Sequence, residues 1–223
     1  HVAVKEGEAE LLRWLNCSLS ALSQTEVWAA LYDTLPGAVT PRLIDEPLNC
    51  IGVAGFASPP ATIASALADI RARDGLVAGV KADVPLFGFK DAGEWSGFEL
   101  DLMREFARRW LGSADKVEFV QVTSGNRIER LLKGDVDLLA ATMTHRKERD
   151  AQIDFSQTYY LDGQNILVRA DREAWPPADR ERIALLDGKT IAAIQGATSL
   201  RRIQEFAREN GIEIKVVEFE QYD

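Results

Sequence analysis

Residues 141–156 hold the side chains best suited to bind an anion. Two hydroxyls, Thr142 and Thr144, follow an apolar strand pattern, and Arg149 comes five residues after the second. A guanidinium group offers a planar fork of donors that matches a carboxylate, and the N–H groups at the start of a short helix would add more. This spacing predicts a carboxylate clamp. The alternative is a surface arginine beside an ordinary loop.

The charge of the chain limits its partners. The 223 residues carry a formal net charge of −9, and no basic run provides the positive surface that nucleic acid or an anionic membrane requires. No apolar stretch is long enough to cross a membrane, and the first residues lack a signal-peptide pattern. Because the chain starts at His1 without methionine, we expect a processed chain or a piece of a longer one, which leaves targeting signals open.

Cysteine and histidine do not suggest a metal or cofactor. Cys17 lies in a helical pattern and Cys50 in a loop-like one, so we expect both thiols to be unpaired rather than bridged. His1 and His145 are the only histidines, which argues against a metal site. The glycines form no phosphate-binding motif, so no cofactor is expected.

Strand and helix patterns alternate from residue 76 onward, which is typical of parallel βαβ units in an α/β fold. Strands are predicted at 76–81, 117–122, 136–141 and 164–169, with helices at 98–111, 126–133 and 146–150. A second series has a strand at 189–194, a helix at 198–210 and a strand at 213–218. Before residue 76, we predict a strand at 1–5 and helices at 8–22, 26–35 and 62–72.

Residues 76–223 resemble the first two-thirds of a family-3 extracellular solute-binding protein, the polar amino-acid receptors of ABC uptake systems. The resemblance is carried by GVKADVPLFGF (79–89), SGFELDLMREFARR (96–109), GDVD (134–137), MTHRKER (143–149), IDFSQTYYLDGQNILVR (153–169) and LLDGKTIAAIQGATS (185–199). It implies a two-lobed periplasmic-binding-protein fold that closes on its ligand like a flytrap. Residues 76–170 would form lobe one and 171–223 the start of an incomplete lobe two.

The first 37 residues resemble the C-terminal tail of the same family, with VAVK followed by AELLRWLNCSLSAL and VWAALYDTLPG. A tail before a start implies tandem binding domains, with residues 1–37 belonging to a preceding domain and 38–75 forming a linker and a helix leading into lobe one. In the alternative, residues 1–37 dock on the lobe formed by 76–170. We expect the severed neighbour rather than docking, because the long 38–75 segment suits an interdomain linker.

The resemblance assigns residues to an amino-acid site. Arg149 would hold the ligand α-carboxylate, with Thr142 and Thr144 as partners, and Thr198 would cap the same carboxylate from lobe two. Lys81 and Arg127 match positions that hold the side-chain carboxylate in members that bind glutamate or aspartate, and Ser124 matches a polar contact there. Three basic residues would compensate a desolvated dicarboxylate. The alternative is that Lys81 is a solvated residue at a strand end and Arg127 a surface residue at a helix start.

Departures from the family pattern qualify the site. Val84 lacks the aromatic ring that stacks on the ligand in many members, which weighs against cationic ligands. The lobe-two aspartate that pairs with the ligand ammonium would lie beyond Asp223, so we expect residues 1–223 alone to bind weakly. Glu99 and Asp101 fit solvated positions in the first turn of helix 98–111 rather than acid–base roles.

The expected function is therefore non-catalytic binding of glutamate or aspartate for ABC transport, with an amide ligand such as glutamine left open. The partners would be the amino acid and a membrane permease, and the location periplasmic or extracellular, with a membrane anchor in a longer parent also possible. The alternatives are a ligand-sensing module of a receptor, a regulatory domain of a cell-wall enzyme, or a dehydratase on the same fold. No nucleophile with a base and an orienting group is present to favour catalysis.

Overall fold

The computed structural model describes residues 1–35, 37, 43, 50, 66–169 and 184–222. The chain divides into two compact units, His1–Leu161 (unit 1) and Asp162–Asp223 (unit 2). Each unit is described by itself. The α/β class expected from the sequence is present in both.

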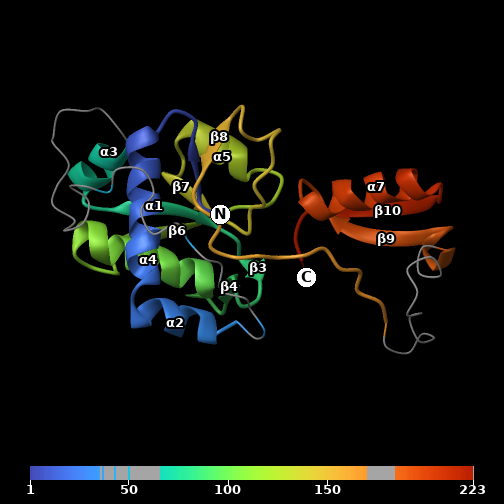
Figure 1. Cartoon of the computed structure of the whole chain (residues 1–223), viewed down its shortest axis with the longest axis horizontal. Coiled ribbons are helices and arrows are strands. Elements are labelled where there is room, and N and C mark those ends of the chain that lie inside the picture. Colours follow the sequence, from blue (N-terminus) through green and yellow to red (C-terminus); the bar gives the residue numbers. More distant parts are fainter. Residues whose placement is uncertain (36, 38–42, 44–49, 51–65, 170–183, 223) are drawn as a thin grey trace. The chain divides into compact units, whose positions relative to one another are not determined.

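Unit 1 is built on a five-stranded sheet (Figure 1). The strand order is β6 (Val117–Gln121), β2 (Leu76–Val80), β7 (Leu138–Ala140), β1 (Ala3–Lys5) and β8 (Ile153–Phe155). β2 pairs in parallel with both β6 and β7, whereas β1 is antiparallel to β7 and to β8. The three parallel strands therefore end at one edge of the sheet.

Helices cover both faces of this sheet. One core cluster joins β2 to α1 (Ala9–Ser23), α2 (Glu26–Asp33), α3 (Ala66–Arg73) and α4 (Phe98–Leu111). A second cluster, on the other face, includes Leu131 of α5 (Arg127–Lys133). Neighbouring strand residues alternate between the clusters, as the period of a strand requires: Leu138 and Ala140 lie in the first and Leu139 in the second.

A small antiparallel sheet, which the sequence analysis did not predict, follows β2. It consists of β3 (Asp83–Val84), β4 (Gly88–Asp91) and β5 (Glu94–Ser96). Its strands are too short to show a clear hydrophobic period. It ends at Gly97, whose φ of 126° suits glycine and where a Cβ would meet the Phe87 carbonyl oxygen at 2.4 Å. The close approach fixes the hairpin against the start of α4.

The N-terminal segment is part of unit 1. β1 lies between β7 and β8, and Ser156 exchanges hydrogen bonds with Val2, with the Val2 N–H donating to Oγ at 2.9 Å and the Ser156 N–H donating to the Val2 carbonyl at 2.9 Å. This packing corresponds to the docked arrangement that the sequence left open as the alternative to a severed neighbour. In this structure residues 1–35 pack with the lobe formed by the later segment.

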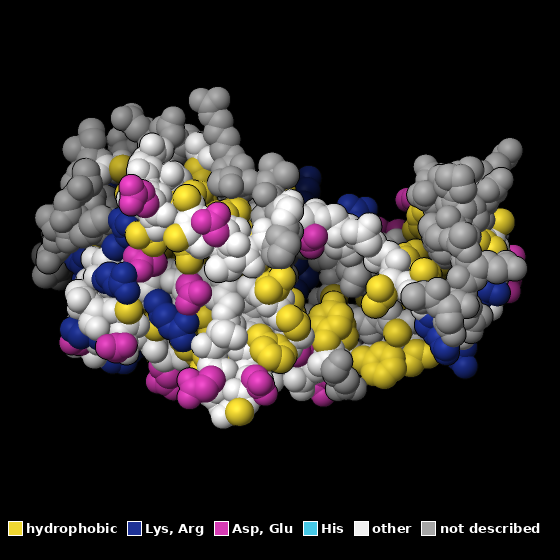
Figure 2. Space-filling model, turned by 90° about the horizontal axis from the view of Figure 1, so that it is seen from below, with side chains coloured by type: hydrophobic (Ala, Val, Ile, Leu, Met, Phe, Trp, Pro, Cys, Tyr) yellow, Lys and Arg dark blue, Asp and Glu magenta, His cyan; other side chains and the backbone are white. Residues whose placement is uncertain are grey.

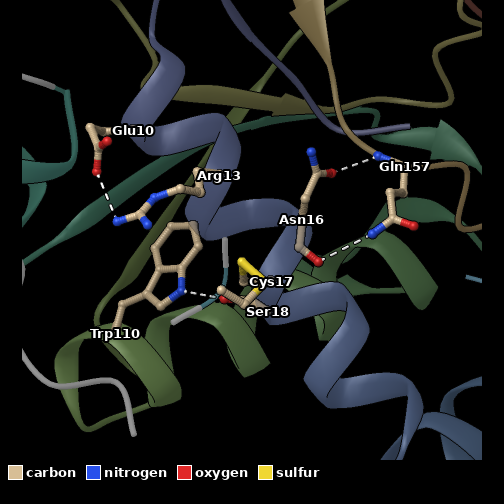
Figure 3. The surroundings of a disulfide bond; sticks show 8 residues. Glu10, Arg13, Asn16, Cys17, Ser18, Trp110 and Gln157 are labelled. Atoms are coloured by element: carbon tan, nitrogen blue, oxygen red, sulfur yellow. Dashed lines mark hydrogen bonds and ion pairs between the residues drawn. A yellow bond between two sulfur atoms is a disulfide. The ribbon is translucent and has the colours of Figure 1, made fainter. Parts of the chain in front are cut away.

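Helix α1 is fixed by polar contacts as well as by its apolar face (Figure 3). The Trp110 indole N–H of α4 donates to Ser18 Oγ at 2.9 Å, where both side chains are buried. Asn16 Oδ1 accepts the Gln157 N–H at 2.7 Å, and the Asn16 carbonyl accepts from Gln157 Nε2 at 3.3 Å. These contacts tie α1 to both α4 and the segment after β8.

The expectation of unpaired cysteines was wrong, because Cys17 and Cys50 form a disulfide with an S–S distance of 2.07 Å. The two residues are 33 positions apart, and Cys17 is buried on α1. Their proximity is a tertiary contact, to which the helical and loop-like patterns around each cysteine gave no guide.

Unit 2 consists of β9 (Lys189–Ile194), α7 (Thr198–Asn210) and β10 (Ile214–Phe219), with the two strands in parallel. The chain begins the second α/β lobe that the sequence predicted, and the predicted bounds of α4, β9 and α7 agree with the structure. Within the described residues, no helix is both long and apolar enough to span a membrane.

Two predicted elements differ from the structure. Residues 147–150 form turns rather than a helix, and residues 164–169 form no strand. A strand requires a hydrogen-bonded neighbour, which a hydrophobic run alone does not provide. Residues 51–65, which include the first four residues of the predicted helix at 62–72, lie outside the described residues. The rest of that predicted helix is covered by α3.

Candidate functional site

The carboxyl ends of β2, β6 and β7 meet at one edge of the unit 1 sheet. Val80 at the end of β2 is the register partner of both Gln121 and Ala140, at the ends of β6 and β7. The segments that begin with Lys81, Val122 and Ala141 therefore leave the sheet side by side. In open α/β sheets, ligands bind at this edge, outside the carboxyl ends of the strands.

Lys81, the first residue after β2, is buried rather than solvated, with 1% of its surface exposed. Its Nζ forms an ion pair with Asp83 Oδ1 at 3.0 Å. The small sheet packs closely against this residue, since a Cβ at Gly88 would lie 2.6 Å from the Lys81 carbonyl oxygen. The charge of Lys81 is thus partly compensated within the protein.

Ser124 and Arg127 follow β6, in the turn that starts α5. Asn126 Oδ1 accepts the Thr123 N–H at 2.8 Å, and Thr123 Oγ1 accepts the Asn126 N–H at 3.2 Å, which shapes the turn. Ser124 is half-buried in it. Arg127 is only 2% exposed, and its Nη1 donates to the Ala141 carbonyl oxygen at 2.5 Å. A residue expected to face a ligand therefore contacts the backbone at the end of β7.

Thr142, Thr144 and Arg149 follow β7. Thr142 is half-buried and has a φ of 48°, a left-handed conformation that is uncommon for threonine. The exposed Thr144 accepts a hydrogen bond at its carbonyl oxygen from Arg149 Nη1 at 2.7 Å. Arg149 thus folds back onto the backbone of Thr144.

The environment of Arg149 differs in one respect from the prediction. It lies in a turn, where its N–H donates to the Arg146 carbonyl at 2.8 Å, and no helix start supplies extra donors. Burial, together with the nearby charge of Arg146, lowers the pKa of the Arg149 guanidinium below its ordinary value. An anionic partner would relieve both effects, because it replaces lost solvation and offsets the like charge.

Glu99 is a functional candidate that the sequence reasoning missed. It is 1% exposed, so the expectation of a solvated helix residue was wrong for Glu99, whereas Asp101 is partly exposed and pairs with Arg104 at 2.7 Å. Both Glu99 oxygens accept the Thr142 N–H, at 2.8 and 3.0 Å, and Oε1 also accepts from the Tyr159 hydroxyl at 2.5 Å. The one available indication was its position between two core residues, Phe98 and Leu100.

Burial raises the pKa of the Glu99 carboxyl, and the hydrogen bond from Tyr159 and the charge of Arg127 partly oppose this rise. The pKa of the Tyr159 hydroxyl is raised by burial and by Glu99. The two hydrogen-bonded side chains therefore share one buried environment.

Thr198, the remaining predicted residue, lies in unit 2 at the N-terminus of α7. It follows Ala197, which is extended with a φ of −79° and a ψ of 154°. The Ala197 N–H donates to the Ile194 carbonyl at 3.1 Å, and the Gln195 N–H donates to the Phe219 carbonyl at 2.8 Å. The turn is well fixed within unit 2, and the first N–H groups of α7 follow it.

Charged groups that could hold a metal do not gather in the described residues: no group of three or more His, Cys, Asp or Glu side chains is present there. His145 is exposed and contacts Asp150 at 2.7 Å. On the face of unit 1 seen in Figure 2, basic and acidic side chains are intermixed and form no continuous basic patch.

Comparison with known proteins identifies similar sequences and structures. The model of bacterial extracellular solute-binding proteins, family 3, matches residues 76–218. The chain is 36% identical over 158 residues to the glutamine-binding protein of Geobacillus stearothermophilus, covering 70% of this chain and 57% of that protein. It is 39% identical over 158 residues to the ABC transporter glutamine-binding protein GlnH of Bacillus subtilis, covering 70% and 55%. The chain thus spans little more than half the length of these relatives.

Solved structures of amino-acid-binding proteins are also similar to this chain. The ancestral amino acid-binding protein AncCDT-1, a precursor of cyclohexadienyl dehydratase, has a TM-score of 0.61 and 35% identity, covering 70% of this chain and 66% of that one. A P235GK mutant of ArgBP from T. maritima has a TM-score of 0.60 and 34% identity, covering 70% and 63%. The similarity extends to both the fold and the sequence.

Proposed function

Because the chain belongs to the bacterial extracellular solute-binding proteins of family 3, we propose that it captures an amino acid outside the cytoplasm for an ABC permease. The family match covers well over half of the chain, and the relatives are named as amino-acid-binding proteins. The amino acid and the permease are the partners proposed for the protein that contains this chain.

The observation that carries this proposal is the geometry after β7. Arg149 Nη1 donates to the Thr144 carbonyl oxygen at 2.7 Å, and Thr142, near the same strand end, adopts a left-handed conformation. A guanidinium held beside Thr144 suits the α-carboxylate that all amino acids share. Ser124 and, from unit 2, Thr198 are the further proposed contacts.

We propose glutamate or aspartate as the ligand, with its side-chain carboxylate near Lys81 and Arg127. Lys81 follows β2, which pairs with β7, and Arg127 at the start of α5 donates to the Ala141 carbonyl oxygen just after β7. Both side chains are buried, with 1% and 2% of their surface exposed, so a ligand carboxylate placed beside them would interact with two cations at a low local dielectric constant.

Glutamine is the second candidate, and one contact favours it. Lys81 already pairs with Asp83 at 3.0 Å, with 1% and 8% of the two side chains exposed. A neutral amide can accept from Lys81 without a further negative charge next to Asp83. Two similar proteins are named as glutamine-binding, and BztA of Rhodobacter capsulatus is named for glutamate, glutamine, aspartate and asparagine.

The disulfide supports a location outside the cytoplasm, in line with a family described as extracellular. Disulfides persist in oxidising compartments and are rare where thiol reductants are abundant. We propose a periplasmic or extracellular location. A membrane anchor in the longer protein is compatible with this location.

Catalysis is the least supported function. The similar proteins are named as binding proteins, and the dehydratase link comes from a structure described as a precursor that binds amino acids. Glu99, the buried carboxyl, is engaged by Thr142 and Tyr159. A receptor or regulatory module would use the same site for sensing.

Calorimetric titration of the full-length natural protein tests the proposal, with glutamate, aspartate, glutamine and arginine as ligands. We expect saturable binding of an acidic amino acid or glutamine, with no change in the ligand by NMR. Arg149→Ala should weaken every ligand at least about a hundredfold, because a charged hydrogen-bonded pair is lost. Arg146→Ala is the matched control, since Arg146 pairs with Glu148 at 3.3 Å.

One further variant separates the candidate ligands. Lys81→Met should weaken glutamate more than glutamine if the ligand side chain is anionic, and both about equally if it is an amide. Failure of every amino acid to bind, or full binding by Arg149→Ala, would reject the clamp.

A further inference from the structure

One peptide group, that between Ala141 and Thr142, is held at both of its polar atoms by buried charged side chains. Its carbonyl oxygen accepts from Arg127 Nη1 at 2.5 Å, and its N–H donates to the two Glu99 oxygens at 2.8 and 3.0 Å. Glu99 and Arg127 are 1% and 2% exposed. The cation lies at the negative end of the peptide dipole and the anion at the positive end, so both contacts favour one orientation.

This peptide group leads directly into the clamp. Thr142 has a φ of 48°, and a β-branched residue in the left-handed region is strained. Such a conformation persists only where surrounding contacts enforce it. Glu99 and Arg127 are the groups that contact this peptide from either side, and the direction of the chain toward Thr144 and Arg149 depends on it.

Glu99 is itself fixed by contacts on other elements. Its N–H donates to the Phe87 carbonyl at 3.0 Å, which ties the start of α4 to the small sheet. Tyr159, 2% exposed, donates its hydroxyl to Glu99 Oε1 at 2.5 Å. The carboxylate thus has a defined position before any ligand binds.

We propose that Glu99 is a positioning residue for ligand binding, which orients the Ala141–Thr142 peptide so that Thr142, Thr144 and Arg149 converge on the α-carboxylate. The inference rests on the proposed function, because it assumes that these three residues hold the ligand. Glu99 itself touches no ligand. Its loss therefore weakens all amino acids by the same factor, whereas a change at a side-chain contact such as Lys81 alters their ranking.

Calorimetry on the full-length natural protein tests this role with two substitutions of the same residue. Glu99→Leu removes the acceptor and should raise the Kd for every bound amino acid by about ten- to a hundredfold, the range expected for one hydrogen bond to a charged group. Glu99→Gln keeps an oxygen for the Thr142 N–H and should restore most of the affinity. Glu105→Leu, on the same helix, is the control, because Glu105 pairs with Arg108 at 2.6 Å.

A second measurement reports on the backbone directly. The three-bond coupling between the amide and α protons of Thr142, measured by NMR without ligand, depends on φ. We expect Glu99→Leu to shift this coupling away from its wild-type value, and Glu105→Leu to leave it unchanged. A purely stabilising role for Glu99 would leave the coupling of the folded protein as it was.

Each outcome decides between the proposals. A folded Glu99→Leu protein with wild-type affinity, or with an unchanged Thr142 coupling, overturns the positioning role. If Glu99→Leu does not fold, Tyr159→Phe takes its place, with the neighbouring Tyr160→Phe as control, and equal Kd values for the two overturn it. If the wild-type protein binds no amino acid, the proposed function fails, and the Thr142 coupling still tests whether Glu99 sets the backbone.

Discussion

The two units contain the same parallel strand–helix–strand arrangement but differ in how their strand ends are held. In unit 1, the backbone after β7 is bonded by Glu99 and Arg127, which are 43 and 14 positions away from the residues they contact. In unit 2, a distant side chain also holds the backbone, with the Glu213 N–H donating to Asp187 Oδ1, 26 positions away, but this contact is exposed rather than buried. Unit 1 also has far more buried apolar residues, while unit 2 buries Leu186, Ile194 and Ala207.

This difference indicates where a ligand can be bound without first ordering the protein. Groups that are already fixed cost little conformational entropy when a ligand arrives. The clamp in unit 1 meets that condition because its backbone is held by buried partners. Unit 2, with a mostly exposed helix and sheet, supplies a helix N-terminus and little else that is rigid by itself.

The largest effect should come from breaking the unit 1 core. Trp14→Ala on α1, where Trp14 is 1% exposed, should lower the free energy of unfolding of unit 1 by about 3–5 kcal/mol. Leu186→Ala in unit 2 is the counterpart and should leave unit 1 unchanged. Hydrogen exchange by mass spectrometry measures both units in one sample. Equal loss of protection in β2 for the two variants would remove the distinction between the units.

Reducing the Cys17–Cys50 disulfide should have the next largest effect. It closes a loop of 33 positions, and bridges of this kind typically contribute about 2–4 kcal/mol. We expect the melting temperature of unit 1 to fall while exchange in β9 and β10 is unchanged. Cys17→Ser without reductant should reproduce the result. A reductant effect that persists in Cys17→Ser would point to another cause.

Two arginines of the unit 1 site, Arg127 and Arg149, should differ in their effect on stability. Arg127→Leu leaves the Ala141 carbonyl without its charged donor and should lower the free energy of unfolding by about 1.5–3 kcal/mol. Arg149→Ala, half-buried in a turn, should change stability by less than about 1 kcal/mol and abolish binding. Chemical denaturation of both variants provides the comparison. A larger loss of stability in Arg149→Ala than in Arg127→Leu would mean that Arg149, and not Arg127, supports the fold.

The smallest effect should be that of Thr198→Ala. A single neutral hydrogen bond contributes about 0.5–1.5 kcal/mol, so we expect a ligand Kd up to about tenfold higher. Calorimetry with the ligand found for the wild type measures it, with Ser199→Ala as the neighbouring control. An effect as large as that of Arg149→Ala would show that unit 2 contributes a fixed contact after all.

Most regular elements could be predicted from the sequence, because their information is local. Helices 98–111 and 198–210 have a continuous apolar stripe and end at Gly112 and Gly211, both left-handed caps. The residues at the strand ends could also be predicted, since parallel strands place Lys81 and Thr142 at one edge.

The roles of single side chains could not be predicted, because they depend on contacts between distant segments. By sequence, Glu99 is an acidic residue in the first turn of a helix, a place typical of solvated side chains. Its contact with the N–H of Thr142, on a distant segment, makes it a buried acceptor. The Cys17–Cys50 bridge and the burial of Arg127 have the same origin. In each case the deciding neighbour lies on another element.

The place of β1 also constrains the order in which unit 1 can fold. Val2 at its start bonds to Ser156, 154 positions later, and β1 separates β7 from β8. A chain emerging from its N-terminus therefore has no partner for β1 until β7 and β8, both far along the sequence, are available. Sheets with such non-local pairings fold slowly, because loop closure precedes the stabilising contacts. Unit 2, whose strands flank a single helix, has no such delay, so its refolding should be the faster of the two.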